Sequence, residues 1–530
     1  MLYFLVSLIP FGAYLWLKTK KSMHMLQLNW YNLDQRYLKW ILKNPYKVFV
    51  DIDAFFIMFL CFLFIQEKLS MLLFIVFYLI VMYLFVRTTK KEQVKVPLKI
   101  TARVKRLLVT TAILYLIPII AMAWFYDAHL LTYYYVFLGL LVYLNPFVVM
   151  TAEFINKPVE KAVFNHFKYQ AMRKLKSMNN LDVIGITGSY GKTSSKNILN
   201  DVLSVRYNVF PTPKNFNTPI GLIISINNYL DKFSDYFIAE MGAFKMGEIQ
   251  ELCDLVHPKY GILTTIGTAH LESFGSQENI QSGKFELIES LPSDGVGILN
   301  ADDPYQVSYE LKNNCKILWI GIEESNVDVW ATDIKLSGKG TSFNVKFKGD
   351  DKLYPFTTRL LGKHNIYNIL ASIALGKELG LSIEQLQTGV KKVNSIEHRL
   401  ELKKVGTLNI IDDAYNSNPV GSKMALEVLD LMPGKKIIIT PGMIELGPQQ
   451  YELNMKFGQY IADVCDEVIL VGAEQTKPIY DGLLSKKYNE KKIHVINDVK
   501  EGFVLMHRLA KGETYILIEN DLPDLFNEKK

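Results

Sequence analysis

The sequence predicts a membrane-anchored α/β protein: five transmembrane helices, then a central α/β domain and a Rossmann-like C-terminal domain. Hydrophobic residues make up 49% of the 530 residues, and their excess is concentrated before residue 150. A short apolar strand, a glycine-rich loop and a helical pattern follow one another over residues 181–195. From there onward, short apolar runs alternate with helical patterns, which is typical of a mostly parallel sheet covered on both faces.

Residues 1–150 form the predicted transmembrane region. Its apolar segments span residues 2–17, 48–65, 71–86, 107–126 and 130–149. A membrane helix needs about 17–25 apolar residues, so the first and third segments are short. The loops at 18–47 and 87–106 carry seven and eight basic residues, against one acidic residue each. The positive-inside rule places both loops in the cytoplasm, so everything after residue 150 is expected on the cytoplasmic side of a bacterial cell membrane.

Two features near the start of the transmembrane region, the first apolar segment and a pair of acidic residues, each have two interpretations. The first segment has no basic residue before its apolar core and no small-residue cleavage motif, so an uncleaved anchor is favoured over a signal peptide. Asp51 and Asp53 begin the second segment. A proton relay is one interpretation, and acids at the membrane interface beside Lys47 are the favoured one.

Charge and cysteine usage exclude several classes of protein. Residues 1–150 carry 16 Lys/Arg and six Asp/Glu, whereas the rest carries 43 and 47, so the net charge of +6 reflects membrane topology rather than nucleic-acid binding. The four cysteines form no CxxC pair, which argues against a zinc cluster or a disulfide framework. They are Cys61, Cys253, Cys315 and Cys465.

Three further regions follow the transmembrane region. Residues 151–180 are predicted to form an amphipathic connecting helix, because apolar residues recur there near helical spacing. The central domain is assigned to 181–398, with strands at 183–187, 236–240, 260–266, 296–299 and 316–320, helices at 194–205, 247–255, 279–291, 365–380 and 382–392, and a β-hairpin over 328–348. The C-terminal domain is assigned to 399–530, with strands at 408–412, 436–440, 467–471, 493–496 and 514–518.

The loop after the first strand of the central domain has the pattern of a phosphate loop. It reads TGSYGKT, and its glycines Gly188 and Gly191 let backbone N–H groups surround the phosphates of a nucleoside triphosphate. Lys192 neutralises the β and γ oxygens, and the Thr193 hydroxyl can ligate Mg²⁺. Ile186 stands where the strict pattern has glycine, so the loop is atypical. A chance glycine turn is the alternative.

Further motifs, taken with this loop, resemble the Mur ligase family of ATP-dependent amide-bond ligases. They are KNFNTPIG (214–221), IAEMGAFKMGEI (238–249), TAHLESFGS (268–276), GKFELIESLP (283–292), GKHNIYNILASIAL (362–375), IIDDAYNSNPVGSKMALEVL (410–429) and PGMIELG (441–447). The resemblance covers about 181–475 and accounts for Ile186. Within the family, the chain most resembles the members that add D-Ala-D-Ala to UDP-MurNAc-tripeptide, and it lacks the DNPR signature of the diaminopimelate- or lysine-adding members.

The resemblance implies an activity and its substrates. A carboxylate of a peptidoglycan precursor is activated by ATP and Mg²⁺ to an acyl phosphate, and an amino acid or dipeptide amine then forms the amide. The implied catalytic residues are Lys192, Glu240, His270, Lys284 and Arg399. The implied metal-binding residues are Thr193, Glu240, His270 and Lys284, with Lys284 carbamylated. The implied nucleotide-binding residues are Gly188, Ser189, Gly191, Lys192, Thr193, Ser194, His364, Asn365, Asn368, Arg399 and Asp413.

Five of these assignments have a plainer alternative. Glu240 at a strand end could be a surface or capping group, and His270 could be structural. Lys284 could be a solvated helix charge, although an unmodified lysine would be unfavourable beside a metal ion. Asn365 could cap a helix, and Asp413 could form an Asx-turn.

The chain departs from the family in the two regions where relatives bind their two substrates. The transmembrane region replaces the domain that grips the UDP-sugar, and IENDLPDLF (518–526) stands where relatives have a KGSRG-like stretch. The acceptor could therefore be the nucleotide tripeptide or a lipid-linked or polymeric envelope precursor, with membrane lipid as a partner and no nucleic acid. Two other classes remain as alternatives: a transporter driven by a phosphate-loop ATPase, and a scaffold that binds nucleotide without catalysis.

Overall fold

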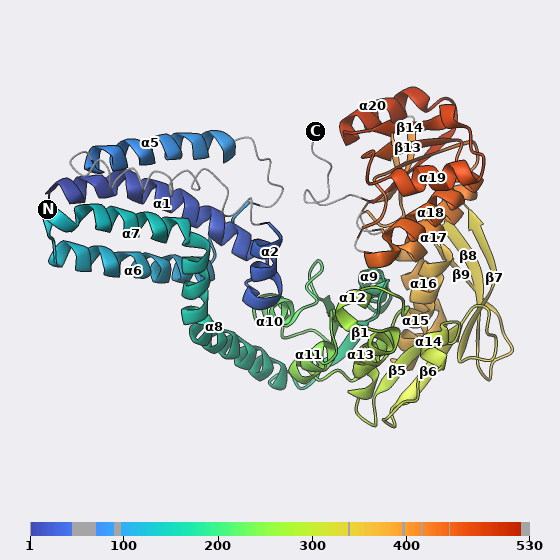
Figure 1. Cartoon of the computed structure of the whole chain (residues 1–530). Coiled ribbons are helices and arrows are strands. Elements are labelled where there is room, and N and C mark those ends of the chain that lie inside the picture. Colours follow the sequence, from blue (N-terminus) through green and yellow to red (C-terminus); the bar gives the residue numbers. More distant parts are fainter. Residues whose placement is uncertain are drawn as a thin grey trace. The chain divides into compact units, whose positions relative to one another are not determined.

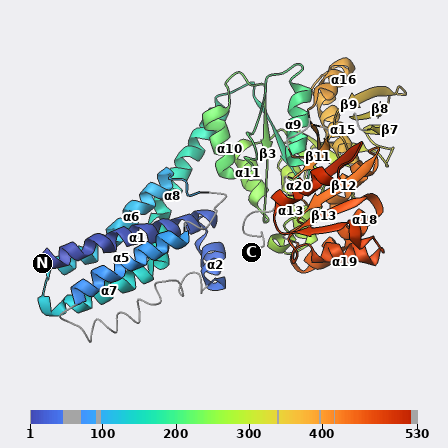
Figure 2. The same cartoon turned by 90° about the horizontal axis from the view of Figure 1, so that it is seen from above.

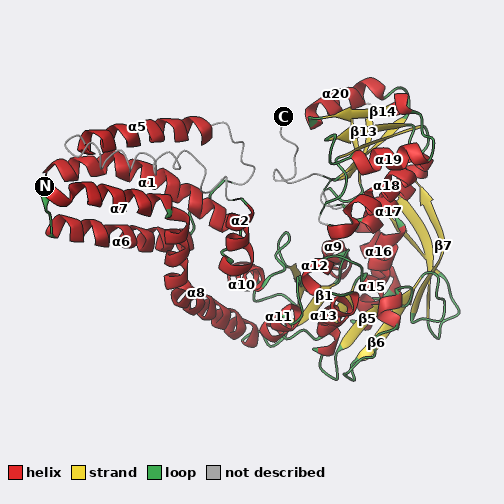
Figure 3. Cartoon of the chain, viewed as in Figure 1, coloured by secondary structure: helices red, strands yellow, loops and turns green. Residues whose placement is uncertain are grey.

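The computed structural model describes residues 2–44, 70–89, 97–337, 340–394, 398–406, 408–414, 417–444 and 446–520. The chain divides into two compact units, Met1–His166 and Phe167–Lys530 (Figure 1). Each unit is described separately. The described part of the first unit is built from helices, and the strands belong to the second (Figure 3).

The first unit is a bundle of long helices. Its elements are α1 (Leu2–Leu28), α2 (Leu38–Lys43), α5 (Ser70–Thr89), α6 (Ala102–Trp124), α7 (Leu131–Tyr143) and α8 (Asn145–Lys176) as far as His166, with short helical turns at Leu33–Tyr37 and Ala128–Leu130. Helices α1, α5, α6 and α7 lie side by side in both views (Figures 1 and 2). Buried aromatic rings hold them together: Phe11 and Tyr14 of α1 pack against Phe74 and Tyr78 of α5, and Phe74 stacks on Tyr135 of α7.

The prediction of five transmembrane helices is not supported by this unit. Among the described residues, only α6 is long and apolar enough to cross a membrane, and α7 and α8 pass the same test only as a pair bent by 71°. The apolar part of α1 ends at Lys18, and the apolar stretch in α5 covers only Leu72–Arg87. The predicted segment at 48–65 lies outside the described residues, as do Asp51 and Asp53.

The chain leaves the bundle through one continuous helix. The predicted fifth segment, 130–149, is broken at Leu144 between α7 and α8. Pro146 explains the break, because proline is favoured in the first turn of a new helix and disfavoured inside an existing one. Helix α8 then runs through Pro158 to Lys176, so it takes in most of the predicted connecting helix at 151–180.

The second unit contains a nine-stranded sheet in the order β2-β3-β1-β4-β5-β6-β7-β8-β9. In this order, each strand from β2 through β1 to β7 runs parallel to the next one, and β8 and β9 are antiparallel additions beside β7. The strands are β1 (Asp182–Thr187), β2 (Val209–Pro211), β3 (Tyr236–Glu240), β4 (Tyr260–Leu263), β5 (Val296–Asn300), β6 (Lys316–Gly321), β7 (Val329–Ser337), β8 (Gly340–Phe347) and β9 (Tyr354–Thr358). The helices are α9 (Lys192–Leu203), α10 (Pro219–Ile224), α11 (Glu248–Val256), α12 (Leu271–Phe274), α13 (Gln277–Glu289), α14 (Pro304–Val307), α15 (Lys363–Glu378) and α16 (Ile383–Lys392), with a turn at Ser225–Tyr229.

Helices cover both faces of this sheet. Ile184 and Ile186 of β1 point into a core shared with α9, α15 and α16. Gly185, between them, points to the other face, where an added Cβ would meet Leu287 of α13 at 2.5 Å. This alternation explains Ile186, because the position belongs to the buried strand and its side chain fills the core.

A six-stranded sheet follows in the same unit, in the order β10-β11-β15-β12-β13-β14. Its strands are β10 (Glu401–Val405), β11 (Leu408–Asp413), β12 (Lys435–Thr440), β13 (Glu467–Val471), β14 (Ile493–Ile496) and β15 (Thr514–Glu519). Its helices are α17 (Pro419–Asp430), α18 (Gln450–Val464), α19 (Lys477–Ser485) and α20 (Val499–Leu509), with turns at Gly447–Gln449 and Glu490–Lys492. Helices α17 to α19 pack on one face and α20 on the other. The α/β prediction is therefore confirmed for both sheets.

Three strands were missed by the sequence analysis, and each lies at the edge of a sheet. Strands β2 and β9 are the two edges of the nine-stranded sheet, and each contains a proline, Pro211 or Pro355. Strand β10, ELKKV, is an edge of the other sheet and is mostly polar. Edge strands tolerate proline and charge, so they lack the apolar run that identifies a central strand.

Candidate functional site

The predicted phosphate loop lies where three parallel strands end. Strand β1 pairs with β3 on one side and with β4 on the other, so the strand order reverses there. In open α/β sheets, ligands bind beyond the carboxyl ends of strands at such a switch point. Residues Gly188 to Gly191 connect β1 to α9 at this place, with Ser194 in the first turn of the helix.

The loop has a backbone that only glycine suits at two positions. Gly188 has φ 147° and Gly191 has φ 83°, and an added Cβ at Gly188 would lie 2.0 Å from Thr264 Oγ1. Thr264 follows β4, and its hydroxyl donates to Tyr190 O at 2.6 Å. Ser189 N donates to Thr265 O at 2.9 Å. The segment after β4 thus braces the phosphate loop, which argues against a chance glycine turn.

Lys192 and Thr193 begin α9 beside the loop. Lys192 Nζ donates to Gly188 O at 2.6 Å and to Ser189 O at 3.2 Å. Burial lowers the pKa of Lys192 to about 8; the Glu240 carboxylate opposes this shift, and the Arg399 charge adds to it. The Thr193 hydroxyl donates to Glu240 Oε1 at 3.1 Å. The sequence-predicted Mg²⁺ pair, Thr193 and Glu240, is therefore brought together.

Glu240 also has a partner that the sequence analysis missed. Lys196 Nζ lies 2.9 Å from Glu240 Oε2, and both side chains are about 2% exposed. Lys196 Nζ also donates to Lys214 O, and Asn217 Nδ2 donates to Glu240 Oε1 at 3.2 Å. The sequence does contain a signal for this pair. Lys196 lies on the apolar stripe of α9, three residues before Leu199, and a lysine is expected on such a buried stripe only if it is paired.

A second group of predicted residues gathers around Lys284 of α13. The Lys284 side chain is buried, and its Nζ donates to Ala243 O at 3.3 Å and lies 5.2 Å from the centre of the Phe274 ring. Burial, followed by the charge of Lys192, lowers the pKa of Lys284 to about 7, against the pull of Glu286 and Glu248. The interpretation of Lys284 as a solvated helix charge is therefore wrong.

His270 belongs to the same group. It has φ 63° and precedes α12, and its ring packs edge-on against Phe244 at 4.5 Å between centres. Burial, then the charges of Lys284 and Lys192, lowers the pKa of His270 to about 4. The ring is thus neutral at physiological pH, as a metal-ligating imidazole must be. Among the described residues no cluster of three or more His, Cys, Asp or Glu is found, so any metal here would also need the lysine and hydroxyl groups.

The predicted nucleotide-binding residues His364, Asn365 and Asn368 lie in the first turns of α15. A Cβ added to Gly191 would lie 3.4 Å from Asn368 Oδ1, so Asn368 is next to the phosphate loop. Asn365 does not cap the helix: Gly362 is the N-cap, and Asn365 Nδ2 donates to Leu361 O at 2.8 Å. The buried His364 Nδ1 makes no hydrogen bond with the described residues. Burial, then the charge of Arg399, lowers the pKa of His364 to about 4.

Arg399 and Asp413 lie where the two sheets are joined. Asp413 Oδ1 accepts the Leu400 N–H at 3.1 Å, so its carboxylate binds a distant backbone group rather than forming an Asx-turn. The half-buried Arg399 influences Lys192, His364 and Asp413 electrostatically. Asn418 caps α17 through Val420 N and Gly421 N, and Asn416 lies outside the described residues.

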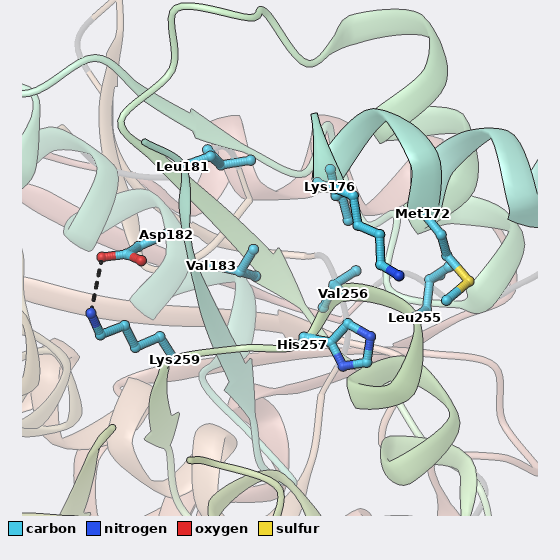
Figure 4. A pocket seen from close by; sticks show the side chains of 10 residues that line it. Met172, Lys176, Leu181, Asp182, Val183, Leu255, Val256, His257 and Lys259 are labelled. Atoms are coloured by element: carbon cyan, nitrogen blue, oxygen red, sulfur yellow. Dashed lines mark ion pairs between the residues drawn. The ribbon is translucent and has the colours of Figure 1, made fainter. Parts of the chain in front are cut away.

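A separate cavity of about 170 Å³ lies at the amino ends of the central strands, where β1 and β4 begin (Figure 4). Met172 and Lys176 of α8, Val256 at the end of α11 and the neighbouring His257 line it. At its rim, Lys259 Nζ lies 3.7 Å from Asp182 Oδ2. The predicted site residues gather at the carboxyl ends of the same strands. This cavity is therefore not part of the candidate site.

Comparison with known protein families identifies two matching regions. Residues 186–376 match the Mur ligase middle domain, and residues 398–519 match the Mur ligase glutamate ligase domain. The UDP-N-acetylmuramoyl-tripeptide--D-alanyl-D-alanine ligase of Bacillus subtilis is 33% identical over 355 residues, which cover 64% of this chain and 75% of that protein. Its Rickettsia prowazekii counterpart is 30% identical over 378 residues, covering 67% and 82%.

Solved structures agree with the fold. The MurF ligase of Thermotoga maritima in complex with ADP is 26% identical, with a TM-score of 0.61, covering 68% of this chain and 80% of that one. MurF from Acinetobacter baumannii has a TM-score of 0.60 at 24% identity, covering 67% and 77%. The regions of similarity take in both sheets.

We predict that Lys196→Met lowers the melting temperature of the purified full chain well below that of Lys316→Met. Removing one partner of a buried ion pair costs about 3–5 kcal/mol, because the remaining charge is uncompensated. Lys316 is the matched control, since it pairs with Glu378 at 2.8 Å on the surface, where such a pair contributes about 0–1 kcal/mol. Equal melting temperatures for the two variants would contradict the role given to Lys196.

Proposed function

The chain belongs to the Mur ligase family of ATP-dependent amide-bond ligases, and from this premise we propose that it adds D-Ala-D-Ala, or a similar amine, to a peptidoglycan precursor. The observation that carries the proposal is the Thr193 hydroxyl at 3.1 Å from the Glu240 carboxylate, directly beside the phosphate loop. The B. subtilis relative is named as the D-Ala-D-Ala ligase acting on UDP-MurNAc-tripeptide. The alternative acceptor is a lipid-linked or polymeric envelope precursor.

The residues at the phosphate loop suit ATP and Mg²⁺. Glycine backbone N–H groups and Lys192 would hold the phosphates, and oxygen ligands from Thr193 and Glu240, directly or through water, are those Mg²⁺ prefers. The metal ion would supply charge neutralisation around the transferred phosphoryl group. Asn368, His364 and Arg399 would face the nucleotide. Asn365 and Asp413 would hold the backbone beside these residues, through Leu361 O and the Leu400 N–H.

The chemistry needs positioning more than covalent catalysis. The γ-phosphoryl group moves from ATP to an oxygen of the substrate carboxylate, which gives an acyl phosphate and ADP. The amine nitrogen then attacks the carbonyl carbon, phosphate leaves, and the nitrogen loses a proton. Lys192 and Arg399 would stabilise the negative charge of the phosphoryl group as it transfers.

A second metal position is proposed around His270 and Lys284. A lysine with a pKa near 7 is largely the neutral amine at physiological pH, which is the form that adds CO₂ and releases a proton to give a carbamate. The carbamate would give this side chain a negative charge, which suits a metal ion, and His270, already neutral, would complete the ligand set. The buried position of Lys284 also protects such a carbamate from water.

We further propose that the first unit is embedded in the cell membrane and that the catalytic unit faces the cytoplasm. Helix α6 exposes Val109, Ile113, Ile117 and Ile120, while polar groups lie inside the bundle. Asn145, for example, is buried and donates to Thr19 and Tyr115. Apolar side chains that face outward, with the few buried polar groups hydrogen-bonded to one another inside the bundle, are the arrangement expected of helices in lipid. A membrane anchor suits an acceptor that lies at the membrane.

Two other classes of function are weaker. The site residues of an amide ligase explain Glu240, His270 and Lys284, which a transport ATPase would leave without a role. A non-catalytic scaffold would not need the Thr193–Glu240–Lys196 arrangement, because a nucleotide can be held by the phosphate loop alone.

The ligase proposal predicts that phosphate release by the purified full chain requires a carboxylate acceptor, such as UDP-MurNAc-tripeptide, and D-Ala-D-Ala together. Lys192→Ala should reduce this release by about a thousandfold or more, because it removes the cation that stabilises the negative charge of the transferred phosphoryl group. Coupled phosphate detection and mass spectrometry of the product provide the measurement. Turnover of ATP without acceptors would favour the transporter, and ATP binding without turnover would favour the scaffold.

The carbamate proposal predicts that Lys284→Ala is inactive and regains part of its activity when small carboxylates such as formate or acetate are added. The added carboxylate would occupy the space of the missing carbamate. Lys192→Ala is the control, since no carboxylate can replace a cation. If no small carboxylate restores any activity to Lys284→Ala, the carbamate is not part of the site.

The membrane proposal predicts that the full chain remains in the membrane fraction after alkaline carbonate washing and is released by detergent. Ile117→Lys on the exposed face of α6 should reduce the inserted fraction, because a lysine near the centre of a membrane helix costs about 2.5–3.5 kcal/mol. Leu353→Lys, at an exposed leucine of the second unit, is the matched control. Release of the unmodified chain by carbonate alone would exclude membrane insertion.

A further inference from the structure

Strand β15 ends in a fully buried glutamate, Glu519, which faces Asp413 at the end of β11. Ser417 Oγ donates to Glu519 Oε1 at 2.6 Å. The other oxygen, Oε2, is buried and receives no donor from the described residues. Asp413 and Glu519 are direct register partners on the neighbouring parallel strands β11 and β15. In the sequence, the stretch that begins at Ile518 is recognised only as a departure from the family, and no pattern gives Glu519 a role.

Two facing carboxyl groups cannot both be ionised in a buried site, so one of them holds a proton. Burial, then the neighbouring Asp413, raises the pKa of Glu519 far above its ordinary value. Burial raises the pKa of Asp413 to about 6, which the Leu400 N–H, the Arg399 charge and the Glu519 hydrogen bond oppose, while Asp412 adds to it. At neutral pH, Glu519 therefore carries the proton, and Asp413 is the carboxylate opposite it in the register of the two strands.

Asp413 and its neighbour hold the backbone on both sides of Arg399. Asp413 Oδ1 accepts the Leu400 N–H at 3.1 Å, and Asp412 Oδ2 lies 2.8 Å from His398 Nδ1. His398 and Leu400 have φ 61° and 46°, a left-handed conformation that costs a non-glycine residue about 1–2 kcal/mol. The two contacts help to maintain this unfavourable backbone, which sets the direction of the Arg399 side chain.

The Arg399 charge reaches the phosphate loop from this position. It lowers the pKa values of Lys192 and His364, so it lies close enough to both for direct electrostatic interaction. The Asp413 carboxylate is the anion that attracts Arg399 from the other side. A chain of contacts thus runs from Glu519 through Asp413 and Leu400 to Arg399.

We propose that Glu519 is a positioning residue for the ATP site: its proton keeps the pair at a single negative charge, and Asp413 thereby holds Leu400 and orients Arg399 toward the bound triphosphate. A second negative charge would draw Arg399 back toward the pair, and loss of the Glu519 side chain would free Asp413 to move. The inference rests on the ATP use proposed above, and it concerns binding of ATP before any acceptor is joined.

The test compares Glu519→Gln with Glu519→Ala in the full chain, by calorimetric titration with ATP and Mg²⁺. The glutamine amide is neutral and can donate to Asp413 as the protonated acid does, so its affinity should stay within about twofold of the parent, while alanine should weaken binding by about fivefold or more. Glu467→Gln is the control, because Glu467 is a paired strand glutamate of the same sheet remote from this pair. Equal losses for Gln and Ala, or no loss for Ala, would overturn the proposal.

Two further readouts separate positioning from a structural role. The infrared spectrum of the parent should contain a protonated carboxyl band at neutral pH that Glu519→Gln lacks and Glu467→Gln keeps; its absence from the parent would overturn the proposal even if Glu519→Ala fails to fold. As pH falls through about 6, Asp413 takes up a proton, and the neutral acid accepts the Leu400 N–H more weakly than the carboxylate does. Arg399 is then held less well, so parent ATP affinity should fall relative to Asp413→Asn. A constant ratio would count against the proposal. A parent that binds ATP but joins no acceptor would overturn only the ligase function.

Discussion

The buried carboxylate of Glu240 is the interaction on which the site depends. A charged group at 1% exposure is stable only if it is paired and hydrogen-bonded, and two separate segments meet that need: Thr193 and Lys196 from α9, and Asn217 before α10. Because both segments meet Glu240 at the end of β3, the carboxylate fixes the start of α9, and with it the phosphate loop, relative to β3.

The order of the strands places everything else around this carboxylate. Strands β1, β3 and β4 are neighbours, so the phosphate loop, Glu240 and the Thr264 brace meet without any long-range adjustment. The sequence was sufficient to predict the central strands, because each is a short apolar run. It was insufficient for β2, β9 and β10, whose prolines and charges suit sheet edges, and for the predicted spans, because apolar composition alone did not show that α1 continues through its lysines or that the chain bends at Leu144.

The candidate site was also predicted only in part. Residues in local patterns, such as Lys192 and Thr193, were found from spacing, and the family resemblance supplied Glu240, His270 and Lys284. Lys196 and Glu519 were missed because their roles depend on partners 44 and 106 residues away, Glu240 and Asp413, which no local pattern connects. A buried charge opposite a second charge is a property of the folded chain, and only the pairing of strands and helices reveals it.

The central claim is that this arrangement activates a carboxylate by phosphorylation, and isotope transfer tests it most directly. The acceptor carboxylate is labelled with ¹⁸O, the full chain is supplied with ATP, Mg²⁺ and the amine, and the released phosphate is examined by mass spectrometry. Acyl-phosphate chemistry predicts one ¹⁸O atom in each inorganic phosphate released, because the carboxylate oxygen leaves with the phosphoryl group. Unlabelled phosphate alongside amide product would contradict the account.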